Sequence, residues 1–171
     1  MPDDPSPQAD PNWSPDGSKI VFAGNSNDAA STVRILDLTT HQVSILPGSQ
    51  TLFGPRWSPD GRYIVAQSSD MTALHLFDFQ TQKWTELAKG TLGDLNWSKD
   101  GLYFYVHDYS GTGAVIRGRL SDGKTERVVD LNFVSTGHWG GSSLALAPDD
   151  SPLLLRDAGT QDVYALDWEE P

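Results

Sequence analysis

Cysteine is absent from this sequence, and so is any long hydrophobic run. Without cysteine the chain has no disulfide, no thiolate nucleophile and no cysteine-liganded metal, which removes several classes of enzyme. The longest apolar runs are about five residues, far below the ~20 that a membrane-spanning helix needs, and the residues near Met1 do not resemble a signal peptide. The sequence therefore predicts a soluble chain without membrane insertion, and it leaves a periplasmic and a cytoplasmic location open.

Basic residues are scarce. The 171 residues include 12 Lys and Arg against 23 Asp and Glu, for a net charge of −11. A surface of that sign repels phosphate backbones and anionic lipid headgroups, so nucleic acid is not an expected partner. A chain of this length can bury one sizeable core, which favours one domain or one repeat array.

Four similar segments recur along the chain. They are WSPDGSKIVF from Trp13, WSPDGRYIVA from Trp57, WSKDGLYFYV from Trp97 and LAPDDSPLLL from Leu146, at spacings of 44, 40 and 49 residues. A period near 40 with strand-like content is typical of propeller blades, because helical arrays of similar period show 3.6-residue periodicity. The sequence therefore predicts an all-β propeller of four repeats.

Each repeat is expected to form a four-stranded antiparallel blade with strands a to d. The Pro-Asp-Gly turn of the first two repeats joins strand a to strand b, because proline presets φ and glycine accepts a positive φ. The second strands begin near 20, 63, 103 and 153, the third near 33, 74, 115 and 163, and the fourth near 43, 84 and 126. The last repeat ends without a fourth run, which predicts about 15 strands and a last blade that lacks its outer strand.

The ends of the array bear on ring closure. Residues 1–10 are predicted to be a disordered or extended leader, and residues 11–171 the repeat array, with repeats starting near 11, 54, 93 and 142. The four prolines of MPDDPSPQADP cannot donate ladder hydrogen bonds, so this segment is a poor closing strand. We expect either an open edge in the fourth repeat or a homodimer that completes a larger ring of eight blades.

The tryptophan that heads each repeat is expected to pack between neighbouring blades, where one ring buries on the order of 150–250 Å². Leu146 fits this role in the fourth repeat, since packing needs bulk rather than an indole nitrogen. Stacking of Trp13, Trp57 and Trp97 on a ligand is the alternative.

Four aspartates also recur at one repeat position: Asp16, Asp60, Asp100 and Asp149. Glycosidases use clustered carboxylates for catalysis, so a carbohydrate-active propeller is one alternative. An active site needs its groups once, however, and recurrence in every repeat therefore favours turn formation.

The W-S-P-D-G motif and the hydrophobic run after it resemble the Pro-Asp type of WD-like repeat found in TolB-like propellers and in the propellers of prolyl-oligopeptidase-like enzymes. The resemblance covers residues 11–169 and weakens at Lys99, Leu146 and Asp150. The tail of the chain, PDDSPLLLRDAGTQDVYALDWEEP from Pro148, is also similar to the C-terminal propeller segments of bacterial sensor or regulator proteins. This resemblance implies a non-catalytic protein-interaction, scaffold or ligand-sensing module, and it transfers no catalytic residue. The alternatives are a propeller that gates or supports a hydrolase or kinase domain on a separate segment, and a carbohydrate-active propeller.

Motifs for catalysis and cofactors are weak. The stretch 140–144 approaches a nucleophile elbow but lacks its final glycine, and the glycines at 111 and 113 precede a predicted strand rather than a helix. The four histidines fall in different repeats, which leaves a zinc site from His107, Asp108 and His138 as a minor alternative. We therefore predict no catalytic residue, no metal ligand and no cofactor.

A binding site is expected on the face that carries the b–c loops and the d–a connections, because these segments differ in every repeat whereas the a–b turns are nearly identical. A protein partner of basic or mixed charge, or a small ligand, is expected there, with Trp139 as its apolar anchor. Alternatively, the side chains of Phe133 and Trp139 fill the open end of the third blade and bind no partner. The predicted binding residues are Asp28, Asp70, His107, Asp108, Phe133, His138, Trp139, Arg156 and Asp157.

Overall fold

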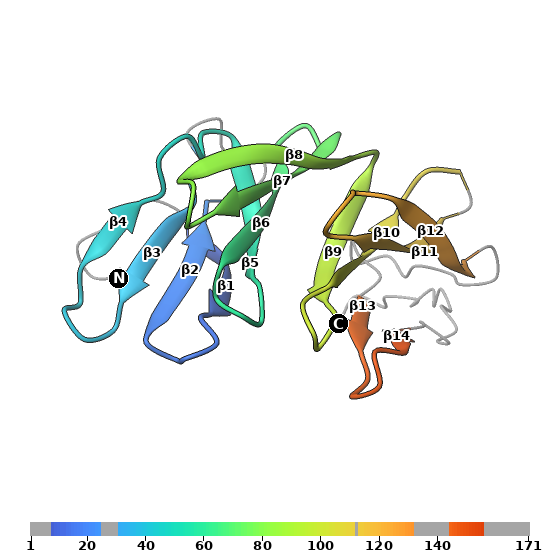
Figure 1. Ribbon diagram of the computed structural model, residues 1–171. Coiled ribbons are helices and arrows are strands. Elements are labelled where there is room, and N and C mark those ends of the chain that lie inside the picture. The colour runs from blue at the N-terminus through green and yellow to red at the C-terminus, as the bar shows by residue number, and fades with distance from the viewer. Residues whose placement is uncertain (1–7, 25–30, 112, 132–143, 156–171) are drawn as a thin grey trace, which may run out of the picture.

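The computed structural model describes residues 8–24, 31–111, 113–131 and 144–155, and these residues are all-β. They form 14 strands in four antiparallel sheets, with no helix in the described ranges. Three sheets have four strands in sequence order, and the last has two. The sheets are the predicted propeller blades and are called blades 1 to 4 below (Figure 1).

The strand bounds follow the repeat. Blade 1 contains β1 (Ala9–Trp13), β2 (Lys19–Ala23), β3 (Arg34–Asp37) and β4 (Val43–Ile45). Blade 2 contains β5 (Leu52–Trp57), β6 (Tyr63–Ser68), β7 (Ala73–Asp78) and β8 (Lys83–Lys89). Blade 3 contains β9 (Leu92–Trp97), β10 (Tyr103–Asp108), β11 (Ala114–Arg119) and β12 (Thr125–Asp130), and blade 4 contains β13 (Leu144–Leu146) and β14 (Pro152–Leu154).

The four-strand pattern predicted for the first three repeats is confirmed. β1 begins at Ala9, inside the range assigned above to the leader. The third strand expected near Val163 lies outside the described residues. Among the described residues the four sheets form an open arc of blades (Figure 1). The described part of the chain contains no helix that could cross a membrane.

One hydrogen-bond network shapes the a–b turns. In blade 1 the Ser14 hydroxyl donates to Asp16 Oδ1 (2.6 Å) and accepts from the backbone N–H of Lys19 (2.9 Å). Ser58 in blade 2 and Ser98 in blade 3 make the same two contacts with their own turns. The turn role predicted for the recurring aspartates is therefore confirmed in these blades.

The a–b turn of blade 4 is one residue shorter than the others. Trp57 pairs with Ile64, seven positions later, and blades 1 and 3 keep this spacing, whereas Leu146 pairs with Pro152, six positions later. Two substitutions explain the change. Ala147 has no hydroxyl where the other turns have serine, and Pro152 has no N–H to donate to one.

This shift of register has a consequence for the faces of blade 4. A slip of one residue exchanges the two faces of a strand. Leu154 therefore packs in the hydrophobic layer between blades 3 and 4, together with Leu146. Leu153, which the repeat alignment would place in that layer, is 52% exposed, and Leu155 is 67% exposed.

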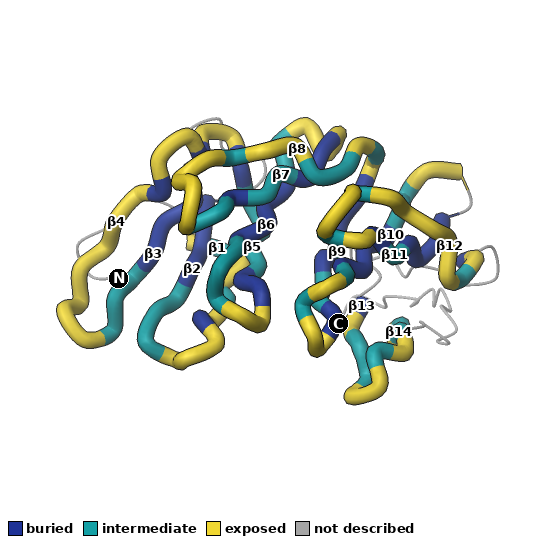
Figure 2. Tube along the Cα trace, viewed as in Figure 1, coloured by how far each residue is buried: buried dark blue, intermediate teal, exposed yellow. Residues whose placement is uncertain are grey.

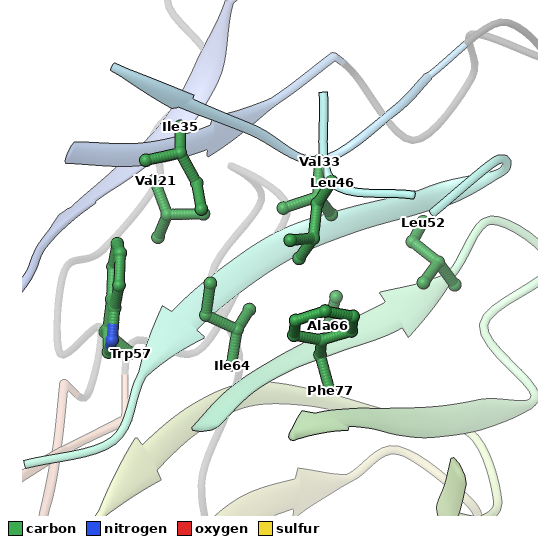
Figure 3. Close-up of a cluster of buried hydrophobic side chains, with 9 residues drawn as sticks. All are labelled: Val21, Val33, Ile35, Leu46, Leu52, Trp57, Ile64, Ala66 and Phe77. Carbon is green, nitrogen blue, oxygen red and sulfur yellow. The ribbon is translucent and has the colours of Figure 1, made fainter. Parts of the chain in front are cut away.

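Hydrophobic layers between consecutive blades form the core. The layer between blades 1 and 2 joins side chains from β2 and β3 to side chains from β5, β6 and β7 (Figure 3). Its buried members are Val21, Val33, Ile35, Leu46, Leu52, Trp57, Ile64, Ala66 and Phe77. The middle strands of blades 1 to 3 are the most buried, whereas β4 and β12 are mostly exposed (Figure 2).

The repeated tryptophans do not all have the same environment. Trp57 is only 9% exposed and lies in the layer between blades 1 and 2, and Trp97 packs against the layer between blades 2 and 3. Leu146 occupies the corresponding place between blades 3 and 4, as predicted. Trp13 is 59% exposed, so the interblade prediction is wrong for this residue. The reason is that Trp57 and Trp97 each cover the preceding blade, and among the described residues no sheet precedes blade 1.

Candidate functional site

The innermost strands of blades 1 to 3 contain a bulge at the same repeat position. Pairing is interrupted after Ala9 in β1, after Phe53 in β5 and after Gly93 in β9. The residues that follow have positive φ angles: 52° at Asp10, 59° at Gly54 and 51° at Asp94. Glycine takes this conformation readily and aspartate tolerates it, and bulges of this kind redirect side chains beside functional sites.

A pocket of about 170 Å³ lies beside these bulges, between blades 2 and 3. Its polar lining comes from Asp10, Arg56, Asp94, Gln67 and Tyr109. Its apolar lining comes from Phe53, Val65, Met71, Leu74 and Leu95. Met71 and Tyr109 belong to b–c loops, so the pocket lies at the end of the blades that the sequence analysis selected for binding.

Asp94 organises one wall of the pocket. Its Oδ2 accepts a hydrogen bond from the Tyr109 hydroxyl (2.7 Å) and lies 3.9 Å from Nδ1 of His107. The rings of His107 and Tyr109 stack with their centroids 4.0 Å apart. A Cβ on Gly93 would lie 2.8 Å from Cε2 of Tyr109, so glycine is required here for the tyrosine to reach Asp94.

Arg56 also lines the pocket. Its guanidinium donates to the carbonyl of Pro55 (2.9 Å) and reaches the carbonyl of Asp10 in blade 1 (3.5 Å). These bonds hold a cationic group beside the Asp10 bulge. The pocket lining therefore combines two carboxylates and one guanidinium with apolar side chains.

Asparagines at the same repeat position as Arg56 connect neighbouring blades. Asn12 Oδ1 accepts from the backbone N–H of Trp57 (2.7 Å), and Asn96 Nδ2 donates to the carbonyl of Leu144 (2.8 Å). These bonds join the inner strand of one blade to the inner strand of the next.

His107 was predicted as a binding residue in a loop, and the structure differs. It lies in β10 and is 2% exposed, because β10 is a middle strand of blade 3 that is buried on both faces. Burial lowers the pKa of His107, although Asp94 and Asp108 partly oppose this effect. A Cβ on Gly113 would lie 3.3 Å from His107 Nε2, so the ring packs against this backbone rather than lining the pocket.

Asp70 and Asp108 do not line the pocket, and each shapes its own turn. Asp70 accepts from the Ser68 hydroxyl (2.6 Å) and from the hydroxyl and backbone of Thr72. The Ser68 and Thr72 hydrogen bonds lower its pKa. Asp108 ends β10 and accepts from the backbone N–H of Ser110 (2.9 Å). Hydrogen bonds within their own turns thus fix the orientation of both carboxylates.

The remaining predicted site residues lie outside the described residues: Asp28, Phe133, His138, Trp139, Arg156 and Asp157. Four residues of the pocket lining were not predicted as site residues: Asp10, Arg56, Asp94 and Tyr109. A signal was available, because ADPNW, FGPRW and GDLNW each place Asp or Gly three residues before the repeated tryptophan. Both residue types accept positive φ, so this pattern is compatible with a bulge.

Within the described ranges, no group of three or more His, Asp or Glu side chains is arranged to hold a metal ion. A wider pocket of about 640 Å³ lies between blades 1 and 2 at the opposite end. Its lining includes Pro15, Asp16 and Asp60 of the a–b turns. Because those turns recur as structural units, this pocket is the weaker candidate.

No protein-family model matches the chain, and no curated protein sequence matches it. Solved β-propellers do resemble it in structure. TolB from Acinetobacter baumannii superimposes with a TM-score of 0.66 at 20% identity, over 82% of this chain and 35% of that chain. The β-propeller domain of the Trilobed protease from Pyrococcus furiosus gives 0.60 at 16%, over 76% and 44%. Oligogalacturonate lyase from Vibrio parahaemolyticus gives 0.55 at 17%, over 74% and 40%.

At these identities the likeness shows the fold. The four-stranded antiparallel sheets fit a TolB-like propeller, as the repeat motif predicted. The chain spans less than half the length of these three solved structures.

Proposed function

We propose that this chain is a non-catalytic binding module that holds a segment of a protein partner in the pocket between blades 2 and 3. The observation that carries the proposal is the composition of this pocket, whose lining combines Asp10, Arg56 and Asp94 with apolar side chains. Binding pockets typically combine mostly apolar walls with a few polar groups that fix orientation.

The charges favour a segment of basic or mixed charge. Asp10 and Asp94 can accept hydrogen bonds from a lysine or arginine side chain, and Arg56 can pair with an acidic neighbour. The net charge of −11 raises the encounter rate of a basic partner and makes the affinity sensitive to salt.

The neighbours in structure include TolB as well as a lyase and a protease propeller, so the fold is compatible with binding and with catalysis. The contact of His107 with Asp94 favours a second candidate, a carbohydrate-active propeller, since such a pair can serve acid–base chemistry. Against it, His107 is 2% exposed and packs against Gly113. If the chain instead supports an enzyme domain on a separate segment, that domain would dock at the same pocket.

Fluorescence polarisation with three labelled peptides of equal length, one basic, one neutral and one acidic, tests the binding proposal. The basic peptide should bind most tightly, and its affinity should fall as salt is added. Asp94→Asn should weaken it by about 0.5–1 kcal/mol, the range for a partly exposed ion pair. Asp16→Asn, on the opposite end of blade 1, is the matched control and should bind like the unmodified chain.

Two results would contradict the proposal. The first is equal binding of all three peptides. The second is cleavage of an oligogalacturonate or chromogenic glycoside that disappears in His107→Gln, which would instead support the carbohydrate-active candidate.

A further inference from the structure

A row of apolar side chains crosses all four strands of blade 1 on one face. The strand register pairs Trp13 with Ile20, Ile20 with Leu36, and Leu36 with Val43. Residues paired directly across antiparallel strands share a face, so these four side chains form a continuous row. Val21, the next residue in β2, points to the other face and packs in the layer with blade 2.

Blade 2 carries the same row, and there it is covered. Trp57 pairs with Ile64, Ile64 with Phe77, and Phe77 with Trp84. Blade 1 packs on this row, which leaves Trp57 9% exposed and both Ile64 and Phe77 at 0%. In blade 3 the row begins with Trp97 and Phe104, and it packs on blade 2. One rule therefore builds the internal interfaces, in which the tryptophan row of each blade covers the blade before it.

In blade 1 the row is exposed at both ends. Trp13 is 59% exposed and Val43 is 39% exposed. Blade 4 at the other end of the arc also presents apolar side chains. Leu154 packs toward blade 3, so the alternation of β14 turns Leu153, at 52% exposure, to the opposite face.

We propose that the exposed row of blade 1 is an interaction surface for a second copy of this chain, whose blade 4 packs on it by the rule that governs the internal interfaces. The contact is head to tail, because the two surfaces are at opposite ends of the arc. Two copies related by a twofold axis satisfy both ends at once, and the arrangement closes as a ring of two chains. This proposal is independent of the pocket between blades 2 and 3.

The choice of a second copy rests on continuity with the interfaces inside the chain. The blade 1 row presents the residue types that its counterpart in blade 2 uses, with tryptophan, isoleucine and a third large apolar residue in register. An exposed row of this kind is unfavourable for an isolated chain in water. Blade 4 of a second copy supplies Leu153 as the matching apolar side chain.

Sedimentation equilibrium of the full chain over a wide concentration range tests the proposal. We expect a mass of about twice the 18.7 kDa of one chain. Trp13→Asp and Leu153→Asp should each shift the equilibrium toward the single chain, because a carboxylate replaces an apolar contact. Leu102→Asp is the matched control, since Leu102 is also 59% exposed but lies beside the a–b turn of blade 3, and its mass should stay doubled.

Mixing the two variants distinguishes a head-to-tail contact from a symmetric one. A pair of one Trp13→Asp chain and one Leu153→Asp chain retains one interface between an intact blade 1 row and an intact blade 4. The mixture should therefore recover association that neither variant shows alone. Circular dichroism spectra like that of the unmodified chain would show that both variants fold.

Three results would overturn the proposal. They are a single-chain mass at every concentration, a doubled mass that persists in Trp13→Asp, and a mixture that behaves as the sum of its two variants.

Discussion

Trp57 and Trp13 occupy the same position of successive repeats in very different environments, which makes them a matched pair for testing the interblade core. Trp57 is 9% exposed and Trp13 is 59% exposed. The perturbation is the same in both cases, replacement of tryptophan by alanine. Only the packing around the ring differs, so the difference between the two variants isolates what burial between blades contributes.

The magnitude for Trp57 follows from its contacts. Deleting a large buried aromatic side chain costs about 3–5 kcal/mol of unfolding free energy. Trp57 also stacks on Phe79 with centroids 5.6 Å apart and planes at 7°, and its Nε1 donates to the Gly61 carbonyl (3.1 Å). Such a stack contributes about 0.5–1.5 kcal/mol, and a hydrogen bond about 1 kcal/mol. We therefore expect about 4 kcal/mol for Trp57→Ala and at most about 1 kcal/mol for Trp13→Ala.

Urea unfolding followed by far-ultraviolet circular dichroism measures both values. A loss of about 4 kcal/mol lowers the midpoint by about 2 M urea if the slope is about 2 kcal/mol/M. The Leu153→Asp background, at low protein concentration, removes any contribution of association to the Trp13 value. Equal losses in the two variants, or an unchanged midpoint in Trp57→Ala, would refute the assignment of Trp57 to the layer between blades.

Three further predictions concern the turns, the blade contacts and a close approach inside blade 3. Hydrogen bonds from Ser14 hold the pKa of Asp16 at about 2, and those from Thr40 and Lys19 do the same for Asp37, below the ordinary 3.8. Because the folded values are lower, this stabilisation is present above about pH 4 and is lost as the pH falls toward 2, so the urea midpoint should fall over that interval and less steeply in Asp16→Asn. Asn12→Ala removes the acceptor for the Trp57 N–H and should cost about 1–2 kcal/mol in the same assay, whereas Asn12→Asp keeps an acceptor and should cost less; equal losses would contradict this role. A Cβ on Gly118 would lie 2.0 Å from the Phe104 ring, so Gly118→Ala should cost about 1–3 kcal/mol, and adding Phe104→Leu should recover part of the loss unless the clash is not the cause.

The repeat motif carried most of the information about the fold. Ser14, Asp16 and Gly17 fix a turn through short-range hydrogen bonds, so their recurrence locates the strands on either side. Interactions over short sequence distances can be read in this way because the partners are neighbours in the chain. The exposure of Trp13 could not be predicted in the same way, since it depends on which blade lies beside it.

The candidate site was less predictable. The face that carries it followed from the irregular b–c loops, but its groups come from bulges in the inner strands of separate blades. Asp10 and Asp94 lie far apart in sequence and meet at one pocket only because the blades are placed side by side. The burial of His107 follows from its place in β10, a middle strand buried on both faces, at a position predicted to lie in a loop.

The layers that join consecutive blades also determine how the chain responds to stress. Each layer couples a blade to its neighbour in sequence, so the free energy of the array is approximately a sum of blade terms and nearest-neighbour terms. Blades 2 and 3 benefit from two couplings each. The strands of blade 2, which are coupled on both sides, should therefore open only with the whole array, as in a linear cooperative chain.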